Sequence, residues 1–419
     1  MNPLARLATA PAYPWLIAVF GMLSLFMSNG LSATGLSVFD PSLLDEYGWP
    51  RADLKFRDVL TFWIAALLAP PVGVLLDRLN PKYLLMAGMA SLSLGMLGYA
   101  ELPSDPRAAL LQIYGIHVIF AFGVACAGGA VVILLVSSWF VKHRGLALGI
   151  ALVGTSLGSA LLPSMNAAII LEQGWRAAFR INALLPLAMF LLIAMLVRGM
   201  PRHAGARAVG QDDRVADLKS EGLTFAEALR TRTFYAICIS GFLTYYSIFA
   251  FLQHLVLHMT KGLGFALAEA ARAFLLFSML AMISKMLAGV LADRFDRHKV
   301  FLWCVGLMFA GVVALATLQR ELLWPAVAAI GLGWGGAFTL YSMLAVSNFG
   351  LREIGRINGV INLCESVGVG LGSWVTGYLF DLYGSYQVAF ASVAVMVGAG
   401  FLLGTQIRNE VARRPAPQS

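Results

Sequence analysis

The chain has 419 residues, of which 59% are hydrophobic and 12% are charged, and its mean hydropathy is +0.78. These values exclude an ordinary soluble globule, whose surface needs more polar and charged residues. The formal charge of +8 does not indicate nucleic-acid binding, because the basic residues fall in every second loop between apolar segments. We therefore expect an integral membrane protein.

Apolar segments long enough to cross a bilayer, about 20 residues each, recur along the chain. We expect twelve of them, beginning near residues 14, 56, 83, 108, 145, 179, 234, 266, 300, 324, 357 and 386. The first follows a short start without a cleavage signal, so we expect it to be retained as helix 1. The predicted fold class is all-α integral membrane, with twelve transmembrane helices in two pseudo-symmetric six-helix bundles.

The charges of the loops predict the orientation and the domain boundaries. The loop from 39 to 53 is acidic, whereas the loops on either side of it along the chain are basic. By the positive-inside rule we expect a multi-pass protein of the plasma membrane, the inner membrane in a Gram-negative organism, with both termini cytoplasmic. Residues 1–199 form the first six-helix bundle, 200–232 a cytoplasmic linker in which FAEALRTRTFYAI favours an interfacial helix, and 233–419 the second bundle with a short cytoplasmic tail.

One loop sequence occurs twice, once in each predicted half. GVLLDRLNPK begins at Gly73 and GVLADRFDRHK begins at Gly289, and an Asp-Arg pair follows each glycine at the same distance. Over essentially its full length the chain resembles the major facilitator superfamily, whose members carry a Gly-x-x-x-Asp-Arg-x-Gly-Arg-Lys type loop between helices 2 and 3 and again between helices 8 and 9. Asn80 and Asp296 stand where that family usually has glycine.

The resemblance implies the major facilitator fold and a role in conformational gating for residues of these two loops. The residues concerned are Gly73, Asp77, Arg78, Gly289, Asp293 and Arg294. The alternative is that the charged members only anchor helix ends at the cytoplasmic surface.

Lys285 is a single charge inside the apolar segment SMLAMISKMLAG. It lies eight residues before Asp293, which places it about 12 Å into the bilayer at the rise of an α-helix. This segment is similar to the oxalate/formate antiporters and the monocarboxylate transporters, which place an arginine four residues before the helix-8 glycine, where it holds the substrate carboxylate. Lys285 stands at that position before Gly289, so the resemblance implies that it binds a carboxylate, as a point charge instead of a bidentate fork.

Glu365 lies at a similar depth in predicted helix 11, nine residues after Arg356. The oxalate carriers have a lysine at the matching position, six residues after the glycine that is here Gly359, so the sign of the charge is reversed. A charge at this depth costs at least about 2.5 to 3.5 kcal/mol, so we expect Glu365 to pair with Lys285. Two alternatives stay open: an ion pair without a transport role, and a Lys285 that extends to the cytoplasmic interface.

Other polar side chains within apolar segments are candidate substrate contacts. They are Asn29, His117, Tyr245, Tyr246, Tyr341 and Asn362. His117 is also a candidate proton relay, with a hydrogen-bonded core histidine as the alternative.

The remaining charged and metal-ligating residues are expected to have no such role. Lys55, Arg57 and Asp58 are expected to be anchors at the outer membrane surface. His254 and His258 are four residues apart, but no third ligand is visible, so we expect no metal site. The four cysteines lie in apolar segments and predict neither a disulfide nor a metal site.

These features predict a secondary active transporter and not an enzyme. No nucleophile elbow, HExxH motif or nucleotide-binding loop occurs in a suitable context, and no cofactor is expected. The expected substrate is a small organic anion, a monocarboxylate, moved by proton symport with alternating access in a monomeric carrier, with Glu365 as the proton-coupling residue. The alternatives are an organic anion exchanger, a drug efflux antiporter and a non-transporting membrane sensor of the same fold.

Overall fold

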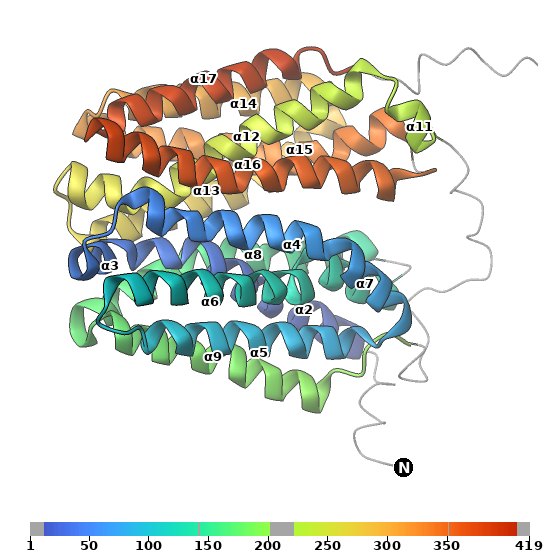
Figure 1. Cartoon of the computed structure of the whole chain (residues 1–419). Coiled ribbons are helices and arrows are strands. Elements are labelled where there is room, and N and C mark those ends of the chain that lie inside the picture. Colours follow the sequence, from blue (N-terminus) through green and yellow to red (C-terminus); the bar gives the residue numbers. More distant parts are fainter. Residues whose placement is uncertain (1–11, 141–142, 202–221, 351, 409–419) are drawn as a thin grey trace, which may run out of the picture. The chain divides into compact units, whose positions relative to one another are not determined.

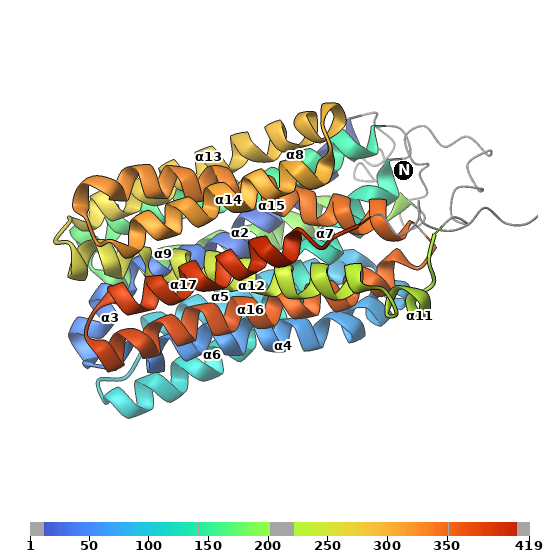
Figure 2. The ribbon, with the colours of Figure 1, turned by 90° about the horizontal axis from the view of Figure 1, so that it is seen from above.

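The computed structural model describes residues 12–140, 143–201, 222–350 and 352–408, without the side chains of Asp77, Arg144, Asp293 and Ser342. Within these ranges the chain is helical and has no β-strand (Figure 1). The helices form two compact units, one of Met1–Asp212 with Leu255–Leu275 and one of Asp213–His254 with Leu276–Ser419. Figure 2 shows that the long helices within each unit run nearly parallel or antiparallel to one another.

The first unit contains the helices of the N-terminal half. They are α2 (Tyr13–Asn29), α3 (Asp40–Tyr47), α4 (Arg51–Arg78), α5 (Pro81–Ala100), α6 (Pro106–Ala127), α7 (Gly129–Trp139), α8 (Arg144–Gln173) and α9 (Trp175–Leu196). Proline occupies the first turn of α2, α5 and α6, where the missing N–H is not needed. The span expected from residue 108 is α6, which ends just before Gly128, and the extended backbone of Gly128 separates it from the additional short helix α7.

The second unit contains most of the C-terminal half. Its helices are α11 (Phe225–Ala228), α12 (Arg232–Leu257), α13 (Leu267–Arg294), α14 (Arg297–Ala316), α15 (Leu323–Phe349), α16 (Ile354–Tyr383) and α17 (Tyr386–Gly404). The last residues of α12 and the first of α13 belong to the first unit. Short α11 begins at a capping box, in which the Thr224 and Glu227 side chains bond each other's backbone N–H.

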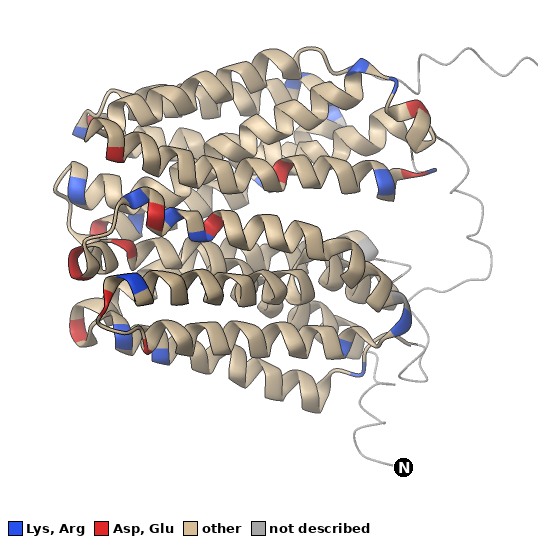
Figure 3. Ribbon diagram, viewed as in Figure 1, with Lys and Arg blue, Asp and Glu red and all other residues tan. Residues whose placement is uncertain are grey.

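Each of the twelve predicted segments is helical in the structure. Among the described residues, eleven helical segments are long and apolar enough to cross a membrane. The twelfth, α16, has 30 residues but carries charged and amide side chains along its length, among them Arg356, Asn362 and Glu365. Figure 3 shows that Lys, Arg, Asp and Glu gather near the helix ends and that the middle of most helices has none. The chain is therefore a multi-pass membrane protein, in which α16 has an unusually polar surface.

The two departures from the family loop have a structural role. The Asn80 Oδ1 accepts a hydrogen bond of 3.0 Å from the Lys82 backbone N–H at the start of α5. In the second half, Asp296 Oδ1 accepts a 2.9 Å bond from the Lys299 backbone N–H at the start of α14. Asparagine and aspartate are favoured N-cap residues, so each side chain caps the helix that follows its loop.

Small residues bring the two 30-residue helices close to their neighbours in the same unit. A Cβ added to Gly158 of α8 would lie 2.4 Å from the Phe26 carbonyl oxygen of α2. A Cβ added to Gly372 of α16 would lie 2.1 Å from the Tyr246 carbonyl oxygen of α12. Such close backbone approach is typical of small-residue contacts between membrane helices, and it places the side chains of α16 directly beside α12.

Candidate functional site

Lys285 lies on α13 with its ammonium over an aromatic ring. The Lys285 Nζ is 4.7 Å from the centre of the Phe338 ring of α15, a cation–π arrangement. Lys285 and Phe338 are both half-buried. The run GLGWGGAF from residue 331 explains this contact, because a Cβ at Gly335 would lie only 2.0 Å from the Ala281 carbonyl oxygen of α13. The glycines let α15 approach α13 closely, which brings Phe338 to Lys285.

Glu365 lies on α16 and is a buried residue, with a relative exposure of 8%. The Tyr245 hydroxyl of α12 is its hydrogen-bonding neighbour. A Cβ at Gly241 of α12, one turn before Tyr245, would lie 3.4 Å from the Glu365 Oε1, which is an ordinary van der Waals contact, so Glu365 packs against this face of α12.

Aromatic rings connect the surroundings of these two charges. Tyr245 packs edge-on against Trp334 at 4.9 Å between ring centres, and Trp334 packs edge-on against Phe338 at 5.6 Å. Tyr341 lies 6.3 Å from Tyr245. We call Tyr245, Trp334, Phe338 and Tyr341 the aromatic cluster.

The aromatic cluster has Lys285 at its Phe338 end and Glu365 at its Tyr245 end. The sequence analysis expected Glu365 to pair with Lys285. Among the ion pairs between described side chains, none joins these two residues directly. The sequence predicted both charges and the two tyrosines, but it did not predict Trp334 and Phe338. The glycine-rich run that contains these two residues was the available signal, because it indicates close packing of this helix against a neighbour.

The other predicted contacts of the second unit are placed differently. The Tyr341 hydroxyl bonds the Ser240 and Thr244 hydroxyls, each at 2.9 Å, so its position is fixed by α12 and its ring is the part that faces Tyr245. Tyr246 is 4% exposed and its hydroxyl lies beside Thr376 and Ser392. Asn362 is exposed on α16, one turn before Glu365. Tyr341 thus belongs to the aromatic cluster, whereas Tyr246 does not.

Asn29 and His117 lie in the first unit. The Asn29 Nδ2 donates a 3.1 Å hydrogen bond to the Thr155 carbonyl oxygen, which joins α2 to α8. His117 is fully buried, with Nδ1 2.6 Å from the Thr61 hydroxyl and Nε2 2.7 Å from the Tyr99 hydroxyl. The substrate and proton roles of both residues remain predictions.

The expected anchors Lys55 and Arg57 are instead fully buried in the first unit, which corrects their assignment to the membrane surface. Their charged groups both bond the buried Asp40 carboxylate, Lys55 Nζ at Oδ2 and Arg57 at Oδ1, each at 2.5 Å. Arg57 also approaches the Tyr99 hydroxyl at 3.5 Å, which connects this group to His117. Buried charges require such partners. Asp40, at the start of α3, supplies one negative charge, and buried Asp58, whose Oδ1 lies 3.7 Å from the Arg57 Nε, supplies another.

We expect the substitution Asp40→Asn to destabilise the protein strongly, because it leaves two buried cations without their shared anion. Loss of one partner of a buried ion pair typically costs about 3 to 5 kcal/mol. The measurement is thermal unfolding of the purified protein in detergent. The matched control is Asp45→Asn on the same helix, where Asp45 pairs with Lys261 at 2.7 Å but is 63% exposed; exposed pairs contribute about 0 to 1 kcal/mol. Equal effects of both variants would contradict the assignment.

The structure describes the predicted gating loops in part. Arg78 ends α4 and Arg294 ends α13, and both side chains are exposed. Gly73 and Gly289 lie within the last turns of the same helices. The side chains of Asp77 and Asp293 lie outside the described residues, so the gating role of all six residues stays a prediction.

No metal site is found among the described residues, which contain no group of three His, Cys, Asp or Glu able to hold an ion. His254 bonds the Ser373 carbonyl oxygen at 2.8 Å and the Tyr386 hydroxyl at 3.1 Å. These bonds give His254 a place in the packing of α12 against α16 and α17.

The chain is similar to known transporters in sequence and to a solved structure in fold. The 4-hydroxybenzoate transporter PcaK of Pseudomonas aeruginosa is 23% identical, covering 91% of this chain and 90% of its own length. The fujikurins efflux protein of Gibberella fujikuroi is 27% identical over 81% of this chain and 70% of its own length. The crystal structure of a bacterial homolog of the human lysosomal transporter Spinster, inward-facing and occupied, matches with a TM-score of 0.76 at 14% identity, covering 97% of this chain and all of that one.

The family follows from the sequence match together with the fold. The model of the Major Facilitator Superfamily matches residues 19–373, which is most of the chain. The long helices of the described residues, the repeated loop and the structural likeness fit this family. The chain therefore belongs to the Major Facilitator Superfamily and is a membrane transporter, not an enzyme.

Proposed function

We propose that the protein carries a monocarboxylate together with one proton, by alternating access. The observation that supports this proposal is the placement of Lys285 and Glu365 at opposite ends of one aromatic cluster. The substrate carboxylate binds the Lys285 ammonium, and the body of the substrate lies against the cluster. Glu365 takes up the proton.

Charge balance makes the proton necessary. Without substrate, Lys285 and Glu365 together carry no net charge. A bound monoanion adds a second negative charge to this weakly solvated region, and like-charged carboxylates favour protonation of one of them. Protonated Glu365 restores neutrality, so the loaded carrier reorients without an additional buried charge. With a bound dianion and protonated Glu365, the site would keep one net negative charge, which argues against dicarboxylates as the main substrate.

The aromatic cluster favours a substrate with an apolar or aromatic body. Aromatic rings pack edge-to-face or offset against one another. Phe338, beside Lys285, and Tyr245, beside Glu365, are both half-buried and so remain partly accessible. The relative from Pseudomonas aeruginosa is named for 4-hydroxybenzoate, an aromatic monocarboxylate. Benzoate-like acids are therefore the substrate class that we favour over short aliphatic acids.

A thermal-shift screen of the purified protein tests this proposal. A ligand that binds only the native state raises its stability by mass action, by about 2.7 kcal/mol at a hundred times its Kd. We expect benzoate-like acids to raise the Tm most, aliphatic monocarboxylates less, and dicarboxylates and cationic compounds little. The substitution Phe338→Leu, which keeps an apolar side chain but removes the ring, should reduce the preference for aromatic acids. Stabilisation by cationic or neutral compounds alone would contradict the carboxylate assignment.

Efflux of an amphipathic compound is the second candidate, because one relative is named as an efflux protein and the aromatic cluster also suits such a compound. The two candidates differ at Lys285. Binding of a neutral amphipathic compound does not need a cation, so it would survive the substitution Lys285→Gln, whereas carboxylate binding would not.

A further inference from the structure

A pocket of about 500 Å³ lies on the second unit, where α12 begins and α17 ends. This is the end of the bundle that the positive-inside rule assigns to the cytoplasm. Its walls are tied together by the Thr233 hydroxyl, which bonds both the carbonyl oxygen and the N–H of Arg408 at 3.2 Å. These hydrogen bonds fix the two walls of the pocket relative to each other.

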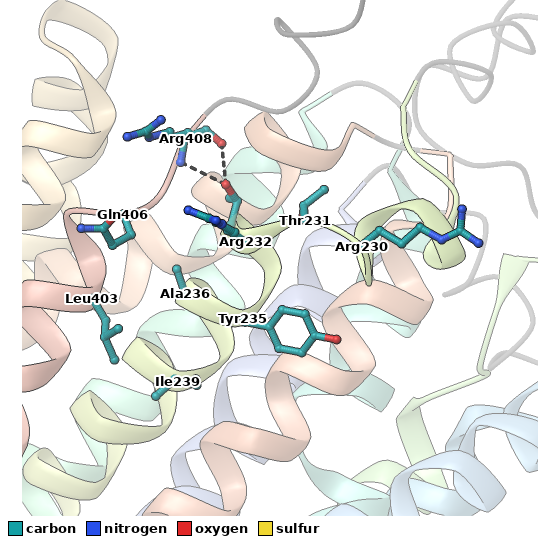
Figure 4. Close-up of a pocket in the computed structure, with 10 residues that line it drawn as sticks. Arg230, Thr231, Arg232, Tyr235, Ala236, Ile239, Leu403, Gln406 and Arg408 are labelled. Atoms are coloured by element: carbon teal, nitrogen blue, oxygen red, sulfur yellow. Dashed lines mark hydrogen bonds between the residues drawn. The ribbon is translucent and has the colours of Figure 1, made fainter.

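The mouth of the pocket is strongly basic. Arg230, Arg232 and Arg408 line it together with the neutral Gln406. All three arginines are exposed, and none forms an ion pair with an acidic side chain in the part of the chain that the structure describes. Figure 4 shows the arginines and Gln406 at one end of the pocket and Ile239 and Leu403 at the other.

The opposite end of the pocket is apolar and faces outward. Tyr235 is 52% exposed and Ile239 is 45% exposed, both on α12. Ile239 also lines a second groove of about 300 Å³, which is formed with Phe242, Leu363 and Val367 and has no charged residue in its lining. From Arg232 to Phe242 the helix rises about 15 Å, so the apolar wall extends from the basic mouth toward the middle of the bilayer.

We propose that this pocket binds an anionic phospholipid. The phosphate lies between Arg232 and Arg408, and one acyl chain follows Ile239 toward the second groove. Basic pockets between transmembrane helices on the cytoplasmic side are the sites at which anionic headgroups bind. A zwitterionic lipid would add its own cation to three arginines, and a free phosphate would leave the outward apolar wall unused. Both are therefore poorer matches than a lipid with a net negative charge.

Native mass spectrometry of the full-length protein tests the proposal. The protein is purified in detergent and mixed with dioleoyl phosphatidylglycerol or dioleoyl phosphatidylcholine, which have the same acyl chains. We expect at least one phosphatidylglycerol to remain bound where phosphatidylcholine is lost. Substituting Arg232→Gln and Arg408→Gln together should weaken retention by about tenfold or more, because each arginine contributes to headgroup attraction. Arg352→Gln, an exposed arginine of another loop, should leave retention unchanged.

Two further experiments distinguish binding of the whole lipid from binding of its headgroup alone, and loss of the site from a folding defect. Soluble glycerol 3-phosphate should raise the Tm less than phosphatidylglycerol, and Ile239→Ser should weaken lipid retention without changing the charge of the mouth. If the double variant loses its fold, the single variant Arg408→Gln replaces it, with about threefold weaker retention expected. Equal retention of the two lipids, equal stabilisation by glycerol 3-phosphate, or unchanged retention in the arginine variants would each overturn the proposal.

Discussion

Replacing Lys285 with alanine should strongly weaken the binding of monocarboxylates and abolish their transport. The ammonium is the cation that the aromatic cluster positions, with Nζ 4.7 Å from the Phe338 ring centre. A hydrogen bond to a charged group contributes about 1.5 to 3 kcal/mol, so its loss weakens binding about ten- to hundredfold. The measurement is the Kd of the best-stabilising monocarboxylate, from titration of the purified protein. Lys285→Arg keeps the charge and should retain measurable binding, with altered affinity because reach and geometry change.

A control variant separates loss of the site from loss of the fold. Lys261→Ala removes the same charge from an exposed position and should bind the substrate as the wild type does. The Lys285→Ala protein should insert and unfold cooperatively, because removal of a half-buried charge from a membrane helix relieves a desolvation penalty. Wild-type affinity in the Lys285→Ala protein would remove Lys285 from the site.

Replacing Glu365 with glutamine should separate proton coupling from substrate binding. Glutamine keeps the shape and a hydrogen-bonding group beside Tyr245 but cannot change its charge. In the Glu365→Gln protein, charge is balanced when the monoanion is bound, so the loaded form can reorient without a proton. We therefore expect exchange between loaded vesicles to persist, within a few-fold of the wild-type rate. Accumulation driven by a pH gradient should fall to the level of protein-free vesicles.

The rival role for Glu365 is to position neighbouring residues of α12. That role predicts that Glu365→Gln, which preserves the contact with Tyr245, keeps accumulation driven by a pH gradient. Glu321→Gln, an exposed residue of the loop before α15, is the matched control and should accumulate substrate normally. If Glu365→Gln also concentrates substrate, Glu365 is not the coupling residue and His117 becomes the next candidate.

The sequence predicted the helices well because a membrane span has a strong signal in a single chain. Length and apolar composition place the segments, with α16 less apolar than the other eleven, and the repeated loop identifies the two halves. The separate short helix α7 was not predicted, because it continues the apolar run of α6 and only the local backbone at Gly128 shows that one helix ends and the next begins.

The candidate site was predicted in part. Lys285 and Glu365 stand out as charges in apolar segments, whereas Trp334 and Phe338 look like ordinary membrane-facing residues. Their contact with Lys285 depends on how closely the glycines allow α15 to approach α13, which is a property of packing between helices. Lys55 and Arg57 show the opposite error, because a basic residue near a helix start looks like a surface anchor until its buried partner, Asp40, is known.

The coupling of one proton to one monocarboxylate is tested most directly by measuring both fluxes in the same proteoliposomes. The experiment starts without a pH gradient and adds the best-stabilising monocarboxylate outside, and protein-free liposomes correct for passive entry of the neutral acid. We predict that the external medium becomes more alkaline, by one proton for each substrate molecule taken up, and that Lys285→Ala abolishes both signals. Substrate uptake without proton uptake, or equal uptake in the Lys285→Ala protein, would contradict the proposed mechanism.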